Sequence, residues 1–182
     1  LKETFVHKIL LPEVNFNEEN FLSGVEKDVS THGYSVIVAS EGLKNEGGEF
    51  YASSTEKDSF GHSQLGGLAP KIASLITDKL GLKNHWSVAD YLQRSARHIS
   101  SLTDIEQAVA VGKAAVKLAA EGKSGVMPII RRISNTPYKW EISDGDLNQI
   151  ANAEKTLPKE YISDDGFRIT KNGTEYLQPL IE

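Results

Sequence analysis

Apolar and polar residues alternate along the first part of the chain in a pattern that predicts a strand, a helix and a second strand. Residues 9–11 form a short apolar run that stops at Pro12, as is typical of a buried strand. Asn17 can cap a helix whose apolar positions recur on one face as far as Gly33. Residues 34–39 form a second apolar run. Because both runs are nearly continuous, we expect strands buried on both faces, as in a parallel sheet.

The pattern continues with a second helix and a third strand. Residues 44–58 are rich in Gly, Ser, Glu and Lys, and this connection is long enough to predict a mobile or functional loop. Residues 65–80 carry apolar side chains at helical spacing, and Gly81 is expected to end that helix. A third strand is expected over 86–92. The alternation predicts an α/β fold with three layers, in which helices cover both faces of a mostly parallel sheet.

The longest helix is expected in the second half of the chain. Thr103 and Glu106 form a capping box at its start, and Gly122 ends it. Its inward positions are expected to be aliphatic or small residues at helical spacing: Ile105, Ala108, Val109, Gly112, Ala115, Val116 and Ala119. A strand over 126–132 is expected to turn near Pro137 into another strand.

Short helical patterns around 147–153 and 175–180 distinguish the end of the chain. We therefore divide the sequence into an α/β domain over residues 1–143 and a helical tail over residues 144–182.

Composition excludes several classes of protein. The 182 residues include 25 acidic and 20 basic side chains, a net charge of −5, and no cysteine. A disulfide scaffold, a thiolate zinc site and a cysteine nucleophile are therefore excluded. The apolar runs are far shorter than the ~20 residues that a membrane span needs, and the acidic pI argues against a general nucleic-acid surface. We expect a cytoplasmic protein with no nucleic-acid or membrane partner.

Polar side chains follow the predicted strands, where open α/β sheets bind their ligands. Glu13 follows the first strand, Glu41 follows the second, and Tyr91 and Arg94 lie at the third. An arginine fork can bind a phosphate, and a carboxylate can accept hydrogen bonds from sugar hydroxyls. The pair Glu13 and Arg94 therefore suits a polyol phosphate. The alternative for each residue is an ion pair or a charge at a helix N-terminus.

Other candidates have weaker support. His62 lies near a helix start and can act as a base or simply cap the helix, while His85 and His98 add possible positive charge near Arg94. The pair Arg131 and Arg132 can serve an effector or a partner, or form a solvated strand end. The sequence contains no metal-binding histidine pair, Walker loop, Rossmann glycine fingerprint or nucleophile elbow.

Four motifs together are similar to the second half of the phosphofructokinases. They are Leu10–Glu13, Val36–Gly42, Phe60–Gly67 and Tyr91–Arg94, and they occur in the family's order and spacing across nearly the whole chain. The form Tyr-Leu-Gln-Arg-Ser-Ala, followed by the long helix, resembles the pyrophosphate-dependent branch most. The resemblance implies the family's sugar-phosphate-binding α/β fold.

The resemblance also implies roles for individual residues. Glu13 matches a glutamate that contacts fructose 6-phosphate, and Tyr91 and Arg94 match residues that contact its phosphate. Leu92 and Gln93 complete the same substrate-binding motif. His85 stands where many members have an arginine that reaches the phosphate from a neighbouring subunit, which puts that contact in question.

Other motifs of the family do not occur in these residues. The phosphate-donor loop with its metal-binding aspartate, and the Thr-Ile-Asp motif with the catalytic base, are absent. The resemblance therefore implies a C-terminal portion without catalytic residues of its own, with Mg²⁺ held mainly by a missing N-terminal part on which the tail can pack. Leu1 as first residue fits an excised segment. The resemblance also implies diphosphate as the phosphoryl donor and a homo-oligomeric enzyme. Two alternatives stay open: an ATP-dependent enzyme, and a module that binds a sugar phosphate without catalysis.

Overall fold

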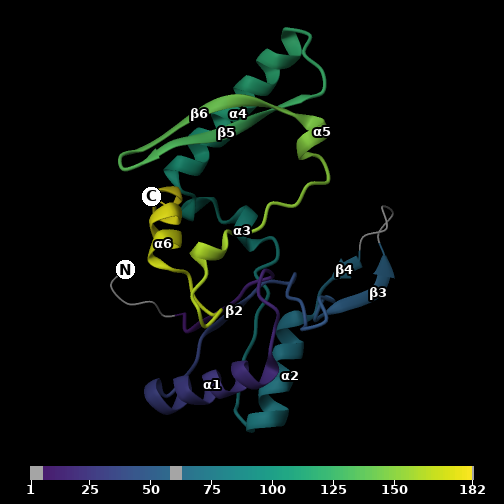
Figure 1. Cartoon of the computed structure of the whole chain (residues 1–182), viewed down its shortest axis with the longest axis vertical. Coiled ribbons are helices and arrows are strands. Elements are labelled where there is room, and N and C mark those ends of the chain that lie inside the picture. Colours follow the sequence, from purple (N-terminus) through teal and green to yellow (C-terminus); the bar gives the residue numbers. More distant parts are fainter. Residues whose placement is uncertain (1–5, 58–62, 182) are drawn as a thin grey trace. The chain divides into compact units, whose positions relative to one another are not determined.

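The protein consists of two compact units. The structure is a computed structural model that describes residues 6–57 and 63–181, without the side chains of residues 53–57, 63–65, 93, 94 and 97. Unit 1 runs up to Asp90 and includes Leu157–Thr170, and unit 2 comprises Tyr91–Thr156 and the residues from Lys171 onward (Figure 1). The chain therefore passes between the units three times. The proposed division into an α/β domain over residues 1–143 and a helical tail over residues 144–182 stays a prediction.

Unit 1 begins with a strand, a helix and a parallel strand. Strands β1 (Lys8–Leu10) and β2 (Ile37–Ala39) pair in parallel and are joined by helix α1 (Glu18–His32). The Asn17 side chain accepts a hydrogen bond from the Asn20 N–H at 2.8 Å, and Gly33 ends the helix in the left-handed region at φ 82°. Both predicted caps are confirmed.

One expectation about these strands is wrong. Val38 in β2 is 50% exposed, so β2 does not bury both of its faces. The reason is that the described elements leave the face of β2 on which Val38 lies partly uncovered.

The second helix packs on the first. Helix α2 (Leu68–Leu80) begins three residues later than expected, because Ser63–Leu65 forms strand β4, which pairs in antiparallel orientation with β3 (Ser53–Lys57). Residues 53–57 of the connection over 44–58, which was expected to be a loop, therefore form a strand. Helices α1 and α2 lie side by side (Figure 1). The apolar core lies here and comprises Leu10, Phe16, Phe21, Val25, Leu43, Ala52, Leu68, Ile72 and Ile76.

The expected third strand is wrong. Residues 82–89 run without regular structure, and Asp90 adopts a φ of 45° before the one-turn helix α3 (Leu92–Ser95) begins. A 3₁₀ turn follows at Arg97–Ile99. No strand lies beside this segment among the described residues, so its extended pattern forms no sheet.

Unit 2 is built from one long helix on a hairpin. Helix α4 (Leu102–Ala120) lies along strands β5 (Val126–Asn135) and β6 (Tyr138–Asp146), and the short helix α5 (Leu147–Ile150) follows (Figure 1). The predicted hairpin and tail helices are confirmed, the latter also by helix α6 (Lys171–Leu177) and 3₁₀ turn η3 (Gln178–Leu180). A further turn, η2 (Lys159–Tyr161), belongs to unit 1.

The start and the inward face of α4 differ from the prediction. Ser101 caps the helix, because its hydroxyl accepts from the Asp104 N–H at 3.3 Å. The side that faces the hairpin contains Gln107, which is 6% exposed and donates to the Tyr138 hydroxyl at 2.7 Å. All seven positions expected to point inward are instead exposed. Two opposite faces of α4 are rich in small and aliphatic residues, and helical periodicity alone does not say which one packs.

Of the helices in the described part of the chain, none combines the length and the apolarity required to cross a bilayer.

Candidate functional site

Glu13 lies on the loop that follows β1 and is exposed. One of its carboxylate oxygens accepts a hydrogen bond from the backbone N–H of Leu157 at 2.8 Å. An ionised carboxylate has about four lone-pair sites, so this bond leaves acceptor capacity for ligand hydroxyls. Glu13 is thus held in place while it can still bind a ligand.

The loop after β2 packs against the loop after β1. The Ser40 N–H donates to the Leu10 carbonyl at 3.1 Å. A Cβ atom on Gly42 would lie 3.3 Å from the Cβ of Pro12, so the small residue permits this close approach. The predicted meeting of polar loops at the carboxyl ends of two parallel strands is therefore observed.

Glu41 has a structural role: it is a charge at a helix N-terminus, which was one of the alternative interpretations of the candidate residues. Its side chain accepts from the backbone N–H of Leu68, the first residue of α2, at 3.3 Å. A negative charge at a helix N-terminus stabilises the helix through the helix dipole.

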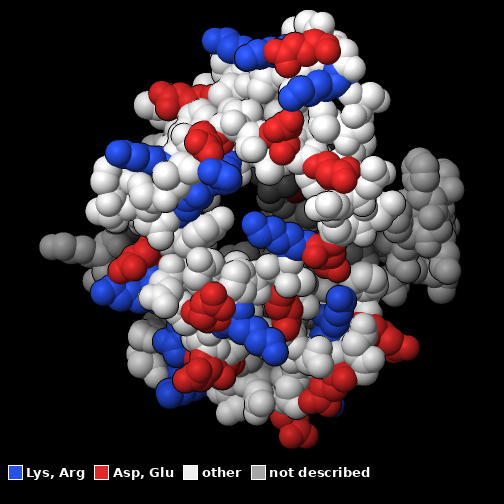
Figure 2. Space-filling model, turned by 45° about the horizontal axis from the view of Figure 1, so that its top comes forward, with Lys and Arg blue, Asp and Glu red and all other residues white. Residues whose placement is uncertain are grey.

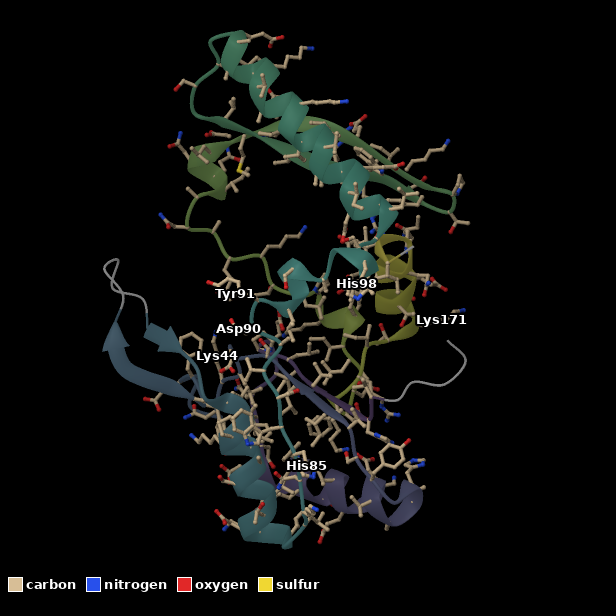
Figure 3. The ribbon with its side chains drawn as sticks, turned by 180° about the vertical axis from the view of Figure 1, so that it is seen from behind. Lys44, His85, Asp90, Tyr91, His98 and Lys171 are labelled. Atoms are coloured by element: carbon tan, nitrogen blue, oxygen red, sulfur yellow. The ribbon has the colours of Figure 1, made fainter. Side chains whose placement is uncertain are left out.

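The Tyr91–Arg94 motif lies at the start of unit 2. Tyr91 immediately precedes α3, and Figure 3 shows it next to Asp90 at the entry to that helix. The side chains of Tyr91 and Leu92 are 67% and 68% exposed. The side chains of Gln93 and Arg94 are outside the described part of the structure. Glu13 belongs to unit 1 and the motif to unit 2, so the predicted substrate residues are distributed over both units.

The histidine candidates gain no support. His62 lies outside the described residues. His85 is exposed on the irregular segment after α2, and His98 is exposed in the 3₁₀ turn after α3 (Figure 3).

Arg131 and Arg132 of β5 contact other residues of unit 2. Arg131 forms an ion pair with Glu141 on β6 at 2.8 Å, on the surface. The Arg132 guanidinium lies between two aromatic rings, 4.7 Å from the Tyr138 centroid and 3.8 Å from that of Tyr176 in α6. This stacking ties the C-terminal helix to the hairpin. The sequence pointed to the basic pair but contained no signal for Tyr176 as its partner.

Unit 1 has a hollow of about 620 Å³ beside the N-terminus of α2, lined by Glu18, Tyr51 and Lys71 among others. The Tyr51 hydroxyl donates to Glu18 at 2.6 Å, and both burial and this carboxylate raise the pKa of Tyr51. The Lys71 ammonium donates to the Tyr51 carbonyl and lies 4.0 Å from the ring centroid. These groups bind one another, and neither Glu13 nor Tyr91 lines the hollow.

Charge is mixed over the surface. On the face shown in Figure 2, lysine and arginine side chains are interspersed with aspartate and glutamate. An anionic ligand is therefore expected to depend on local contacts. Within residues 6–57 and 63–181, His, Asp and Glu side chains do not gather in threes that can hold a metal ion.

Comparison with known proteins identifies the relatives of this fold. No protein-family model matches the chain. It is 55% identical to a pyrophosphate–fructose 6-phosphate 1-phosphotransferase of Methylococcus capsulatus, over 96% of this chain and 41% of that protein. It is 49% identical to a protein of the same name from Halomonas elongata, over 97% of this chain and 42% of that protein.

Solved structures agree. A pyrophosphate-dependent phosphofructokinase from Nitrosospira multiformis superimposes with a TM-score of 0.80 at 48% identity, over 96% of this chain and 40% of that one. The corresponding structure from Marinobacter aquaeolei gives a TM-score of 0.78 at 48% identity.

The fold is therefore the α/β fold of the phosphofructokinases, as predicted. Along nearly its whole length the chain belongs to the phosphofructokinase family and matches members of its pyrophosphate-dependent branch, which confirms the resemblance seen in the sequence. It spans about two fifths of the length of the relatives that it matches, so it corresponds to a portion of such a protein.

Proposed function

We propose that this chain is the fructose 6-phosphate-binding portion of an enzyme that transfers a phosphoryl group from diphosphate to the 1-hydroxyl of fructose 6-phosphate. The observation that carries the proposal is the 55% identity, over 96% of this chain, to a protein named for that reaction. Glu13 adds support, because its carboxylate is exposed, is fixed by Leu157 and can still accept hydrogen bonds.

The residues of this chain would hold the acceptor. Glu13 would accept hydrogen bonds from the sugar hydroxyls, and Arg94 would bind the 6-phosphate with two parallel charge-assisted bonds. The Tyr91 hydroxyl would donate a hydrogen bond to the same phosphate, and Leu92 and Gln93 complete the motif on α3. Fixing the acceptor in line with the donor is a large part of catalysis in phosphoryl transfer.

The remaining groups would come from outside this chain. The catalytic base, the diphosphate site and the Mg²⁺ ligands belong in the part of the relatives that this chain does not span. This chain alone would therefore be inactive as a transferase. We also propose a cytoplasmic homo-oligomer, as the family resemblance implies.

The test joins this chain to the rest of a relative. In the Methylococcus capsulatus protein, the stretch matched by this chain is replaced with this chain to give a full-length chimera. We expect fructose 1,6-bisphosphate to form from fructose 6-phosphate and diphosphate without ATP, while this chain alone forms none. The unmodified relative is the control.

Two other results would change the proposal. The donor site of the chimera comes from the relative, so the donor is tested in the full-length protein that contains this chain: turnover there with ATP and none with diphosphate would make it an ATP-dependent phosphofructokinase. A folded chimera that binds fructose 6-phosphate but transfers no phosphoryl group from either donor would make this chain a non-catalytic sugar-phosphate-binding module.

A further inference from the structure

Asp90 has a backbone conformation that few residue types adopt. Its φ of 45° lies in the left-handed region, where residues with a side chain are sterically disfavoured. Among the described residues with a positive φ, the others are glycines and Asn152. Aspartate and asparagine tolerate this region best after glycine, whereas β-branched residues are outliers there. The conformation of residue 90 therefore restricts which side chains the position accepts.

This conformation lies directly before the substrate motif. Residues 82–89 run without regular structure, and Tyr91 then has a helical backbone, with φ −77° and ψ −7°, at the start of α3. Figure 3 shows Asp90 and Tyr91 at the entry to that helix. A left-handed residue turns the chain sharply. Asp90 therefore sets the direction in which the motif begins.

Few interactions hold α3 itself. The Tyr91 carbonyl accepts hydrogen bonds from the backbone N–H and from the hydroxyl of Ser95, both at 3.0 Å. The Ala96 N–H donates to the Leu92 carbonyl at 2.8 Å. A helix of one turn is only marginally stable by itself, and the side chains of Tyr91 and Leu92 are mostly exposed. The conformation of the motif therefore depends on the residue that precedes it.

The carboxylate of Asp90 does not account for an aspartate at this position. The side chain is exposed, so it adds no packing in a core. A negative charge next to a bound sugar phosphate repels that ligand. The tolerance of aspartate for a positive φ accounts for the residue better than its charge does.

We propose that Asp90 is a positioning residue, whose left-handed backbone holds Tyr91 and α3 in the conformation that binds the sugar phosphate. The inference rests on the proposed function, because that function supplies the ligand of the motif. A residue that resists a positive φ lowers the population of the binding-competent conformation. The apparent affinity for fructose 6-phosphate then falls by the same factor.

Substitutions in the full-length chimera separate the backbone of Asp90 from its charge. Asp90→Gly and Asp90→Asn keep the tolerance for a positive φ and remove the charge, whereas Asp90→Val opposes that φ because valine is β-branched. Asp90→Ala imposes a smaller strain and replaces the valine variant if the latter does not fold. Asn152→Val is the matched control, because Asn152 has a φ of 59° on the segment after α5 and lies outside the motif.

We expect Asp90→Val to raise the KM for fructose 6-phosphate by about 5- to 30-fold, the change in population that corresponds to left-handed strain. The kcat and the KM for diphosphate should change by less than about twofold, because saturating sugar phosphate restores the bound conformation. Asp90→Gly and Asp90→Asn should stay within about threefold of the parent, with Asp90→Ala between them and valine. Asn152→Val should lower the thermal midpoint and leave the KM unchanged.

Three results would overturn the proposal. The first is a normal KM for fructose 6-phosphate in both Asp90→Val and Asp90→Ala. The second is an equal rise in Asp90→Gly and Asp90→Asn, which would assign the effect to the carboxylate. The third is an equal rise in Asn152→Val, which would assign it to general destabilisation.

Hydrogen exchange tests the positioning role without a ligand. In the chimera, deuterium uptake of a peptide that covers residues 92–96 should be at least about threefold faster in Asp90→Val than in the parent, and unchanged in Asn152→Val. Equal uptake in the parent and Asp90→Val would overturn the proposal. A parent chimera that neither binds nor converts fructose 6-phosphate would contradict the proposed function alone, so the two can fail separately.

Discussion

The carboxylate of Glu13 and the backbone N–H of Leu157 form a 2.8 Å hydrogen bond across 144 residues of sequence. Leu157 is the first residue of the segment that re-enters unit 1 from unit 2. The candidate acceptor for the sugar hydroxyls therefore also fixes a point at which the chain passes between its units. A change at Glu13 is expected to affect both ligand binding and local structure, and two substitutions separate these effects.

Glu13→Gln retains an oxygen that can accept from Leu157 but loses the charge, whereas Glu13→Ala loses both. We expect Glu13→Gln in the chimera to weaken fructose 6-phosphate binding by about 10- to 100-fold, the size of a hydrogen bond to a charged group. Its unfolding free energy should stay close to that of the parent, while Glu13→Ala should lose about 1 kcal/mol. Calorimetric titration and denaturant unfolding measure the two quantities. If Glu13→Gln binds normally and only Glu13→Ala is destabilised, Glu13 has a structural role alone.

A second prediction concerns the ion pair between Lys8 and Asp28 in unit 1. The Lys8 ammonium lies 2.9 Å from the Asp28 carboxylate, with side-chain exposures of 7% and 17%. Lys8→Met leaves the partly buried Asp28 carboxylate with the Ser35 hydroxyl but without its ion-pair partner, so the variant is expected to lose about 1–3 kcal/mol of unfolding free energy. The double variant Lys8→Met with Asp28→Leu should recover most of that loss.

Denaturant titration can follow this change in unit 1 alone. The chain has two tryptophans, Trp86 in unit 1 and Trp140 in unit 2. In a Trp140→Phe background the fluorescence reports unit 1. A double variant as unstable as Lys8→Met would show that packing, rather than the charge pair, stabilises this site.

Through Asp165, the unfolding free energy of unit 1 is expected to fall at low pH. Burial alone would raise its pKa, but hydrogen bonds from the Ser163 hydroxyl, the Arg168 guanidinium and the Phe167 N–H lower the pKa from 3.8 to about 2. The folded state therefore binds this proton less readily than the unfolded state. The stabilisation is fully present above about pH 4 and is lost as the pH falls through about 2.

Asp165→Asn should remove that pH dependence. The side chain is 41% exposed, so solvent screening reduces the expected contribution to about 1 kcal/mol. Unfolding free energies of parent and variant, measured between pH 2 and pH 5, should converge at the acid end. Parallel curves over that range would contradict the assignment.

Local chemistry made parts of the fold predictable from the sequence. The caps at Asn17, Gly33 and Gly81 depend on single side chains and their immediate backbone, and all three are observed. The hairpin of β5 and β6 follows from alternation and a turn near Pro137. These features need no knowledge of distant residues.

Features that depend on distant residues were not predictable. The sequence could not show that Glu13 would meet Leu157 or that Arg132 would stack on Tyr176, because nothing local links them. The expected inward face of α4 was wrong because both of its sides are rich in small and aliphatic residues. The burial of Lys8 in an apolar strand depends on Asp28 in the helix that follows.

Arg94 offers the most direct test that this chain provides the acceptor site. In the chimera, Arg94→Ala is expected to raise the KM for fructose 6-phosphate by about 10- to 100-fold, through loss of a charge-assisted bond to the phosphate. The KM for diphosphate should change by less than about twofold, because the substitution is expected to remove no contact with the donor. Arg131→Ala, on the surface of β5, is the matched control and should leave both constants unchanged. An unchanged KM for fructose 6-phosphate, or equal increases for both substrates, would contradict the assignment of this chain as the sugar-phosphate-binding portion.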